Sequence, residues 1–363
     1  MEDKIYRLIK EAEALREKSK YRDSLEIFKK ALSISKRHGI LDGILDSTIA
    51  MADIYRMTGN FDKAVKNYED ALEASEALGN KFTAADCMAG MGLSLRAMGM
   101  WRDAIRFISA ARKIYEKEKD KKGTAFSLWA EAGALRVAGN ITRAIKKFNE
   151  SKNIFSSAKD TSGVAYSLCG LGGTHRIAGK FKESLQYYQQ ANETFKNLKD
   201  KFGIAYSHCG IGNACRMLDN YKDALKHFER ATILYEEIRD VVSYSYTLWS
   251  LANVHKMKTD FANAKFYITK ALRNFEKTKD PRGIIYCNLT LGEVMFMEGR
   301  KGLAEKKFLS ALQSADRHDF KLERCHAQML LTAVGSRQSA VKTACYKRIG
   351  VNLNFTGIPF NMP

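Results

Sequence analysis

Basic side chains recur once every 40 residues along most of the chain, as Arg16, Arg56, Arg96, Arg136, Arg176, Arg216 and Lys256. A guanidinium group presents a planar fork of donors that can bind a carboxylate or a phosphate through two parallel hydrogen bonds. A regular row of such groups suits an anionic ligand whose charges are also regularly spaced. We call these residues the basic file.

A structural role for the basic file is the main alternative. An arginine in the last turn of a helix can bond the free carbonyls there and oppose the helix dipole, which contributes about 0.3–1 kcal/mol. Arg16 and Arg56 also have a carboxylate three residues earlier, in Glu13 and Asp53. Arg96, Arg136, Arg176 and Arg216 have no carboxylate at that spacing, so local ion pairing does not explain them. Helix capping and salt bridges between repeats stay possible, but the pattern favours ligand contact.

Three more stripes run parallel to the basic file, at offsets of three, four and three residues that place all four on one face of a helix. The most informative members are aromatic in the first two stripes and small or amide-bearing in the third. We expect the amides to bond a ligand main chain and the glycine to admit it, although the tyrosines also suit packing against the preceding hairpin. These members are Phe126, Tyr166, Tyr206 and Tyr246, then Trp129 and Trp249, then Gly173, Asn213 and Asn253.

No residue pattern indicates catalysis. The glycine-rich run at 170–173 lies inside an expected helix, and no Gly-Lys-Ser/Thr follows it, which argues against a phosphate-binding loop. His175, Cys215 and His255 lack the spacing of metal ligands, and we expect them to pack in the core. We therefore predict a protein that is not an enzyme, has no cofactor and has no metal site.

The elements that position these stripes form a repeat of 40 residues without insertions. In the unit 163–200, an apolar-periodic segment ends at Gly179, and a second segment from Phe181 to Leu198 has apolar residues at helical spacing. Small residues recur in the first segment, as at Gly172, which suggests close approach of another helix. One such hairpin cannot bury its apolar face alone, so neighbouring hairpins must stack on it.

The order Leu171, Gly172, His175, Gly179, Phe181, Ser184, Tyr188, Ala191 resembles the tetratricopeptide repeat, and the unit with Leu251, Ala252, His255, Ala264 and Ala271 resembles it again. The period exceeds the usual 34 residues and is similar to the long-helix variety of spindle-orientation adaptors, kinesin light chains and some bacterial sensor domains. The resemblance implies an all-α fold, a right-handed α-solenoid of eight antiparallel helix hairpins with a C-terminal capping helix. Thr259 and Ser243 replace glycines of the pattern.

The resemblance also implies that the first helices line a concave groove in which an extended ligand lies. One arginine would meet every third ligand residue, because packed helices stand about 8–10 Å apart and an extended peptide advances about 3.3 Å per residue. We therefore predict a cytoplasmic scaffold or adaptor that binds an extended acidic segment of a partner protein. The predicted site is Phe126, Trp129, Arg136, Tyr166, Gly173, Arg176, Tyr206, Asn213, Arg216, Tyr246, Trp249, Asn253 and Lys256.

Two other functions remain open. Single-stranded RNA could place phosphates on the arginines and bases on the aromatic rings, although Glu13, Asp53, Asp86 and Glu293 would repel phosphates at the ends of the groove. A sensor of a small peptide or metabolite is the other possibility. The net charge of +19 agrees with an acidic or polyanionic partner in each case.

Composition and the chain ends complete the expectations. No apolar run is long enough for a membrane span and no signal-peptide order is seen, so we expect no membrane partner. Seven widely spaced cysteines suggest reduced thiols. We divide the chain into repeats at 1–320, a capping helix at 321–335 and a basic, then apolar, tail at 336–363. The tail is expected either to be poorly ordered or to act as a docking or self-inhibiting segment. Its lack of acidic side chains argues against docking in the groove, although the terminal carboxylate could bind there.

Overall fold

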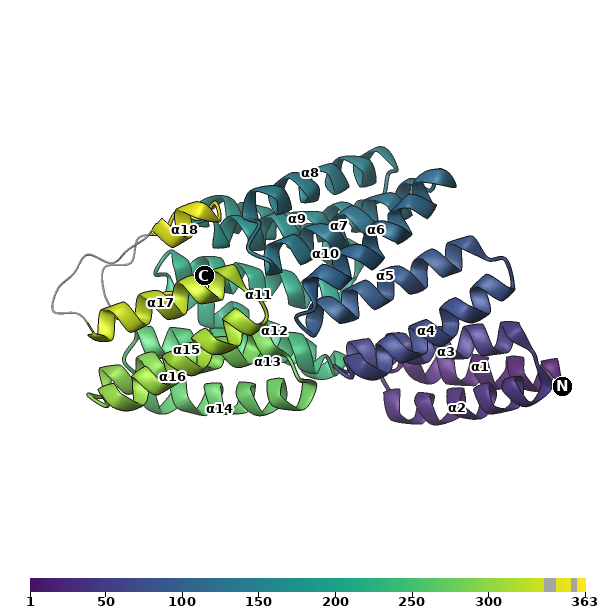
Figure 1. The fold of residues 1–363 in the computed structure, drawn as a ribbon, viewed down its shortest axis with the longest axis horizontal. Coiled ribbons are helices and arrows are strands. Elements are labelled where there is room, and N and C mark those ends of the chain that lie inside the picture. Colours follow the sequence, from purple (N-terminus) through teal and green to yellow (C-terminus); the bar gives the residue numbers. More distant parts are fainter. Residues whose placement is uncertain (336–343, 354–357) are drawn as a thin grey trace.

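The computed structural model describes residues 1–335, 344–353 and 358–363, and every regular element in these residues is a helix (Figure 1). Consecutive helices pair into eight antiparallel hairpins that stack as a right-handed solenoid, so the predicted fold class is confirmed. The first helices are α1 (Glu2–Glu17), α3 (Leu41–Met57), α5 (Lys81–Ala97), α7 (Lys121–Val137), α9 (Thr161–Ile177), α11 (Lys201–Met217), α13 (Val241–Met257) and α15 (Pro281–Met297). The second helices are α2 (Tyr21–His38), α4 (Phe61–Ala77), α6 (Trp101–Lys117), α8 (Ile141–Ser157), α10 (Phe181–Leu198), α12 (Tyr221–Ile238), α14 (Phe261–Thr278) and α16 (Lys301–Arg317), followed by α17 (Lys321–Gly335) and α18 (Ala344–Arg348).

Short local signals fix where the helices begin and end. The carboxylate of Asp160 accepts a hydrogen bond from the backbone N–H of Gly163, and equivalent aspartates cap α7, α11, α13 and α15. The turn after each first helix needs a left-handed residue, which Gly179 provides with a φ of 87°. Thr259 takes the same position with a φ of 59°, a strained conformation for a β-branched residue.

Small residues let the two helices of a hairpin approach each other closely, as the sequence suggested. A Cβ on Gly172 would lie 2.8 Å from the ring of Tyr188, and one on Gly212 would lie 2.7 Å from the ring of Phe228. Both rings are buried in one continuous apolar core. Alanine at either glycine would force the helices apart or displace the ring.

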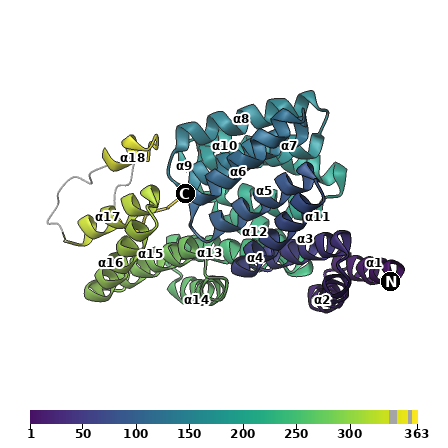
Figure 2. The same cartoon turned by 45° about the vertical axis from the view of Figure 1, so that its right-hand side comes forward.

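The solenoid winds back onto itself, which the repeat pattern did not predict. Residues 217 positions apart form hydrogen bonds: Tyr21 donates to the carbonyl of Ile238, and Trp101 Nε1 donates to the carbonyl of His318. Lys279 forms an ion pair of 2.6 Å with Asp62 across the same seam. Both ribbon views show the early hairpins beside the late ones (Figures 1 and 2). Residues from both early and late repeats therefore bound the concave groove.

The described part of the tail packs against the solenoid. Cys325 on α17 and Cys345 on α18 form a disulfide with Cα atoms 5.8 Å apart, so the expectation of reduced thiols is wrong for this pair. The backbone N–H of Asn352 donates to the carbonyl of Ala178, and residues 358–363 enter the groove. The remaining tail, 336–343 and 354–357, lies outside the described residues. Among the described helices, none has the length and apolar character that crossing a bilayer requires.

Candidate ligand-binding groove

Four members of the basic file reach towards the next repeat, to the position 37 residues later in the sequence: Arg16, Arg96, Arg136 and Lys256. Arg16 lies 3.6 Å from Asp53, and Lys256 lies 2.5 Å from Glu293. Arg136 follows the same course, because a Cβ on Gly173 would lie 2.8 Å from its Nη1 atom. Gly173 therefore makes room for the arginine of the preceding repeat, whereas we expected it to allow close approach of a ligand main chain.

The file is neutralised at its two ends and not in its centre. Arg16 pairs with Glu13 at 2.8 Å, and Arg56 pairs with Asp53 at 3.5 Å. No Asp or Glu side chain of the described residues forms an ion pair with the central arginines; two of them face aromatic rings instead. These central members are Arg96, Arg136 and Arg176.

The central arginines line one cavity of about 290 Å³, which we call the arginine cavity. Arg282, at the start of α15, lines it too and is paired with Glu323 at 2.6 Å. The Nε and Nη1 atoms of Arg176 are buried without a hydrogen-bond partner among the described residues. Burial, and next the charge of Arg136, lowers the pKa of Arg96 to about 10. The cavity therefore holds a concentration of partly buried positive charge.

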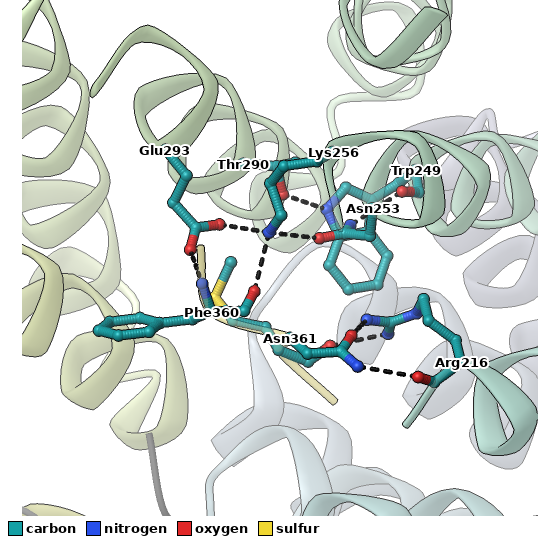
Figure 3. A network of polar contacts seen from close by, with 9 residues as sticks. Arg216, Trp249, Asn253, Lys256, Thr290, Glu293, Phe360 and Asn361 are labelled. Carbon is teal, nitrogen blue, oxygen red and sulfur yellow. Dashed lines mark hydrogen bonds and ion pairs between the residues drawn. The ribbon is translucent and has the colours of Figure 1, made fainter. Parts of the chain in front are cut away.

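Residues 358–363 lie along the groove beside this cavity and are held mainly through their backbone (Figure 3). The N–H of Phe360 donates to Glu293 at 2.6 Å, and the carbonyl of Phe360 accepts from Lys256 at 2.8 Å. Arg216 donates to the carbonyl of Met362 at 2.7 Å and also to the side chain of Asn361. The tail thus enters the groove despite its lack of acidic side chains, because carbonyl oxygens accept the bonds.

Burial changes the ionisation of the residues that hold this segment. Lys256 and Glu293 have completely buried side chains, and burial lowers the pKa of the lysine and raises that of the glutamate. Burial, and next the charge of Arg176, lowers the pKa of Arg216 to about 9. These groups pay a desolvation penalty that only close partners can offset.

The predicted amides orient cations in the structure. Asn213 donates to the carbonyl of Cys209 at 3.1 Å and accepts from Arg216 at 3.2 Å. Asn253 repeats this arrangement one hairpin later, because it donates to the carbonyl of Trp249 and accepts from Lys256. Both amide oxygens therefore position a basic side chain, a role that differs from the expected contact with a ligand main chain.

The predicted aromatic residues mainly connect one repeat to the next. The hydroxyl groups of Tyr166 and Tyr246 donate to Asp200 and Asp280, and the indole of Trp249 donates to Thr290. Tyr206, Tyr246 and Trp249 line the arginine cavity, together with Arg136, Gly173, Arg176 and Asn213. Phe126, Trp129 and Tyr166 line a separate cavity of about 500 Å³ with Asp86, Asp120 and Asp160. Arg216 and Lys256 lie with the C-terminal segment, so the predicted site is divided into three neighbouring parts.

Sequence reasoning missed the groove residues that come from distant parts of the chain. Arg282 lines the arginine cavity because the superhelix returns, and Pro363 lines it because the tail docks. No repeat spacing indicates these contacts. The partner of Lys256 did have a signal, since Asp53 and Glu293 both stand 37 residues after a basic residue.

Comparison with solved structures supports the architecture. The Rap conjugation gene regulator of the plasmid pLS20, solved in complex with the Phr* peptide, superposes with a TM-score of 0.68 at 12% identity, over 92% of this chain and 98% of that one. A Rap protein complexed with competence and sporulation factor gives a TM-score of 0.58 at 13% identity, with the same shares covered. The apo form of RapI gives 0.55 at 15% identity, over 75% of this chain and 97% of that one. At these identities the likeness concerns the fold.

A search of curated proteins found no match. The sequence profile of the tetratricopeptide repeat matches residues 8–77, 43–117 and 163–237, which together make up about half of the chain. The matched segments contain hairpins whose turns, caps and small residues follow the 40-residue pattern seen in the structure. The chain therefore belongs to the tetratricopeptide repeat family.

Proposed function

We propose that the protein is a non-enzymatic, cytoplasmic interaction scaffold that binds an extended acidic segment of a partner protein in its groove. The observation that carries this proposal is the C-terminal segment 358–363, which already lies in the groove and is bound there through main-chain groups. Arg216, Lys256 and Glu293 hold it through backbone groups that any peptide possesses. Two of the similar structures were solved as complexes, one with the Phr* peptide and one with competence and sporulation factor, which agrees with this use of the fold.

The acidic character of the partner segment follows from the charge pattern. The protein supplies carboxylates to the file at its ends, through Asp53 and Glu293, but not in the centre. A bound segment with acidic residues would supply those charges and gain bidentate hydrogen bonds from the guanidinium groups. The direction of the segment would follow from the acidic residues Asp86, Asp120 and Asp160, which lie in the cavity nearer the N-terminus.

The observed contacts favour protein over RNA. Bases would have to stack on exposed aromatic faces, but Trp249 is buried, and Tyr246 and Trp249 are held by hydrogen bonds within the array. A second candidate function is a sensor of a small ligand, because the arginine cavity is of a size that a small molecule can fill. About 290 Å³ is close to the lower limit of small-molecule sites.

Fluorescence anisotropy with designed peptides tests the proposal. The probe is a labelled 12-residue peptide with glutamate at every third position, and its control has glutamine at those positions. We expect wild-type protein to bind the glutamate peptide at least about tenfold more tightly, because several charge-assisted hydrogen bonds are each stronger than neutral ones. Equal affinity for the two peptides would show that acidic groups are not recognised.

A matched pair of protein variants locates the binding face. R136E/R176E inverts two central charges of the groove, while R106E/R143E inverts two exposed arginines on the second helices α6 and α8. We expect the first variant to lose binding of the glutamate peptide and the second to retain it, with unchanged helical circular dichroism in both. Equal loss in both variants would indicate attraction by net charge alone.

A further inference from the structure

The central arginines lack the counter-ions that the same register provides elsewhere in the molecule. A basic residue at one position faces the residue 37 places later, and at the ends of the file that residue is acidic. In the centre it is glycine for Arg96 and Arg136, because Gly133 and Gly173 are the residues that their guanidinium groups cover. At these two positions a glycine hydrogen stands where the ends of the file have an acidic side chain, so the arginines have no carboxylate in this register.

In the remaining walls of the arginine cavity, no acidic side chain of the described residues forms an ion pair with these three arginines. Arg282 brings a further cation, but Glu323 compensates it at 2.6 Å. Asp280 also lines the cavity, and its carboxylate accepts hydrogen bonds from the N–H of Gly283 and the hydroxyl of Tyr246. Among the described residues, Asp280 is the one acidic side chain that lines the cavity, and its carboxylate is bonded to neutral donors and not to the arginines of the file.

Such an arrangement is unfavourable unless something offsets it. Two nitrogen atoms of Arg176 are buried without a hydrogen-bond partner among the described residues. An unpaired buried donor costs about 1–3 kcal/mol, and more when it is charged. The charge of Arg136 also lowers the pKa of Arg96, after the larger effect of burial. A purely structural cap would not explain three neighbouring cations that repel one another.

We propose that the arginine cavity is a binding site for a compact ligand with two or more adjacent anionic groups, held by Arg96, Arg136 and Arg176. The volume of about 290 Å³ accommodates two or three carboxylate or phosphate groups, such as acidic side chains of a segment that lies along the groove. This proposal deepens the proposed function and rests on it for the source of the ligand, which is a pair of adjacent acidic side chains in the partner segment. A free oligoanion has the same chemistry and is the other source.

Thermal unfolding with defined anions tests the site without any partner. The probes are citrate and inorganic pyrophosphate, compared with acetate at equal ionic strength. At a concentration of about 100 times Kd, we expect the Tm of the wild-type protein to rise by about 3–5 °C with a multivalent probe. Acetate should have little effect, because it offers only one anionic group.

Variants with glutamine in place of arginine separate specific binding from general salt effects. R136Q/R176Q should lose the rise in Tm with citrate and pyrophosphate, and its Tm without these anions should equal or exceed that of the wild type, because repulsion is relieved. R106Q/R143Q removes the same net charge from exposed positions and should respond like the wild type. An equal rise in all three proteins, or none in the wild type, would overturn the proposal.

The peptide assay distinguishes failure of this site from failure of the proposed function. Protection by citrate or pyrophosphate that depends on Arg136 and Arg176 supports the site even if no acidic peptide binds, and it then indicates a free oligoanion as the source. Binding of the glutamate peptide to wild type and R136Q/R176Q alike, without protection by the small anions, overturns the site and leaves a peptide-binding groove. Competition between citrate and a peptide with two adjacent glutamates supports the partner segment as the source.

Discussion

Replacing Glu293 by leucine should destabilise the protein strongly, because it leaves the charge of Lys256 buried without its partner. Both side chains are completely buried, and their charged atoms lie 2.5 Å apart. The N–H of Phe360 would lose its acceptor as well. Removing one member of a buried pair typically costs about 3–5 kcal/mol. The cost has an upper limit, because Lys256 can become neutral by losing a proton. Removing the proton from a lysine of ordinary pKa, about 10.4, requires about 4.6 kcal/mol at pH 7.

Because Lys256 can lose its proton, the free-energy cost of E293L should depend on pH. In the E293L variant, the pKa of Lys256 in the folded protein should fall further below that of the unfolded chain. A group with a lowered folded pKa makes stability rise with pH between its folded and unfolded values. At pH 9 the cost of neutralising the lysine falls to about 1.9 kcal/mol. The difference in unfolding free energy between wild type and E293L should therefore shrink from pH 7 to pH 9.

Urea unfolding followed by circular dichroism at both pH values measures these quantities. K256M/E293L removes both charges and should recover most of the loss, because apolar replacement of a buried pair is often neutral or stabilising. E26L is the matched control: it breaks the exposed pair of Glu26 with Lys29, and because solvent screens this pair the unfolding free energy should change little. A cost for E293L that matches E26L, or that is the same at pH 7 and pH 9, would refute the reasoning.

Three further predictions concern packing, backbone strain and pH. G172A should lower the unfolding free energy by about 1–3 kcal/mol through overpacking, whereas G302A, in open space on α16, should raise it by about 0.5–1 kcal/mol in the same urea assay. T259G should stabilise by about 1 kcal/mol by relieving a φ of 59°, while T58G, at a φ of −88°, should destabilise; a gain in both would contradict the strain argument. Burial, and next the charge of His227, lowers the pKa of His208 to about 4. The stability that the neutral imidazole contributes is fully present above about pH 6.5 and is lost as the pH falls towards 4. H208N should show a correspondingly shallower loss of stability in this range.

The groove illustrates how far a repeat can be analysed from its sequence. The offsets of three, four and three residues correctly placed the stripes on one helical face, since Arg136, Gly173, Tyr206 and Asn213 share one cavity. The roles of individual residues were less accessible. Asn213 and Gly173 serve the arginines next to them, and this could not be read from residue type because an amide or a glycine suits either role.

The tail illustrates a second limit. Its lack of acidic side chains argued against docking in a basic groove, and only the terminal carboxylate was expected to suit the arginines. In the structure, Arg216 and Lys256 bind carbonyl oxygens, which every residue possesses. Backbone recognition leaves no mark in a sequence, so docking of such a segment follows only from its position in space.

The sequence by itself determined the hairpin, its length, its boundaries and the face that carries the basic file. These features depend on contacts within about 40 residues: helix caps such as Asp160, turn residues such as Gly179, and small residues such as Gly172 opposite a ring. Only the tertiary structure decided that the array closes on itself, that Arg282 joins the arginine cavity and that the tail lies beside it. The rotation between neighbouring hairpins is small and accumulates over many repeats, so residues 217 positions apart meet through a sum of packing angles that no local pattern specifies.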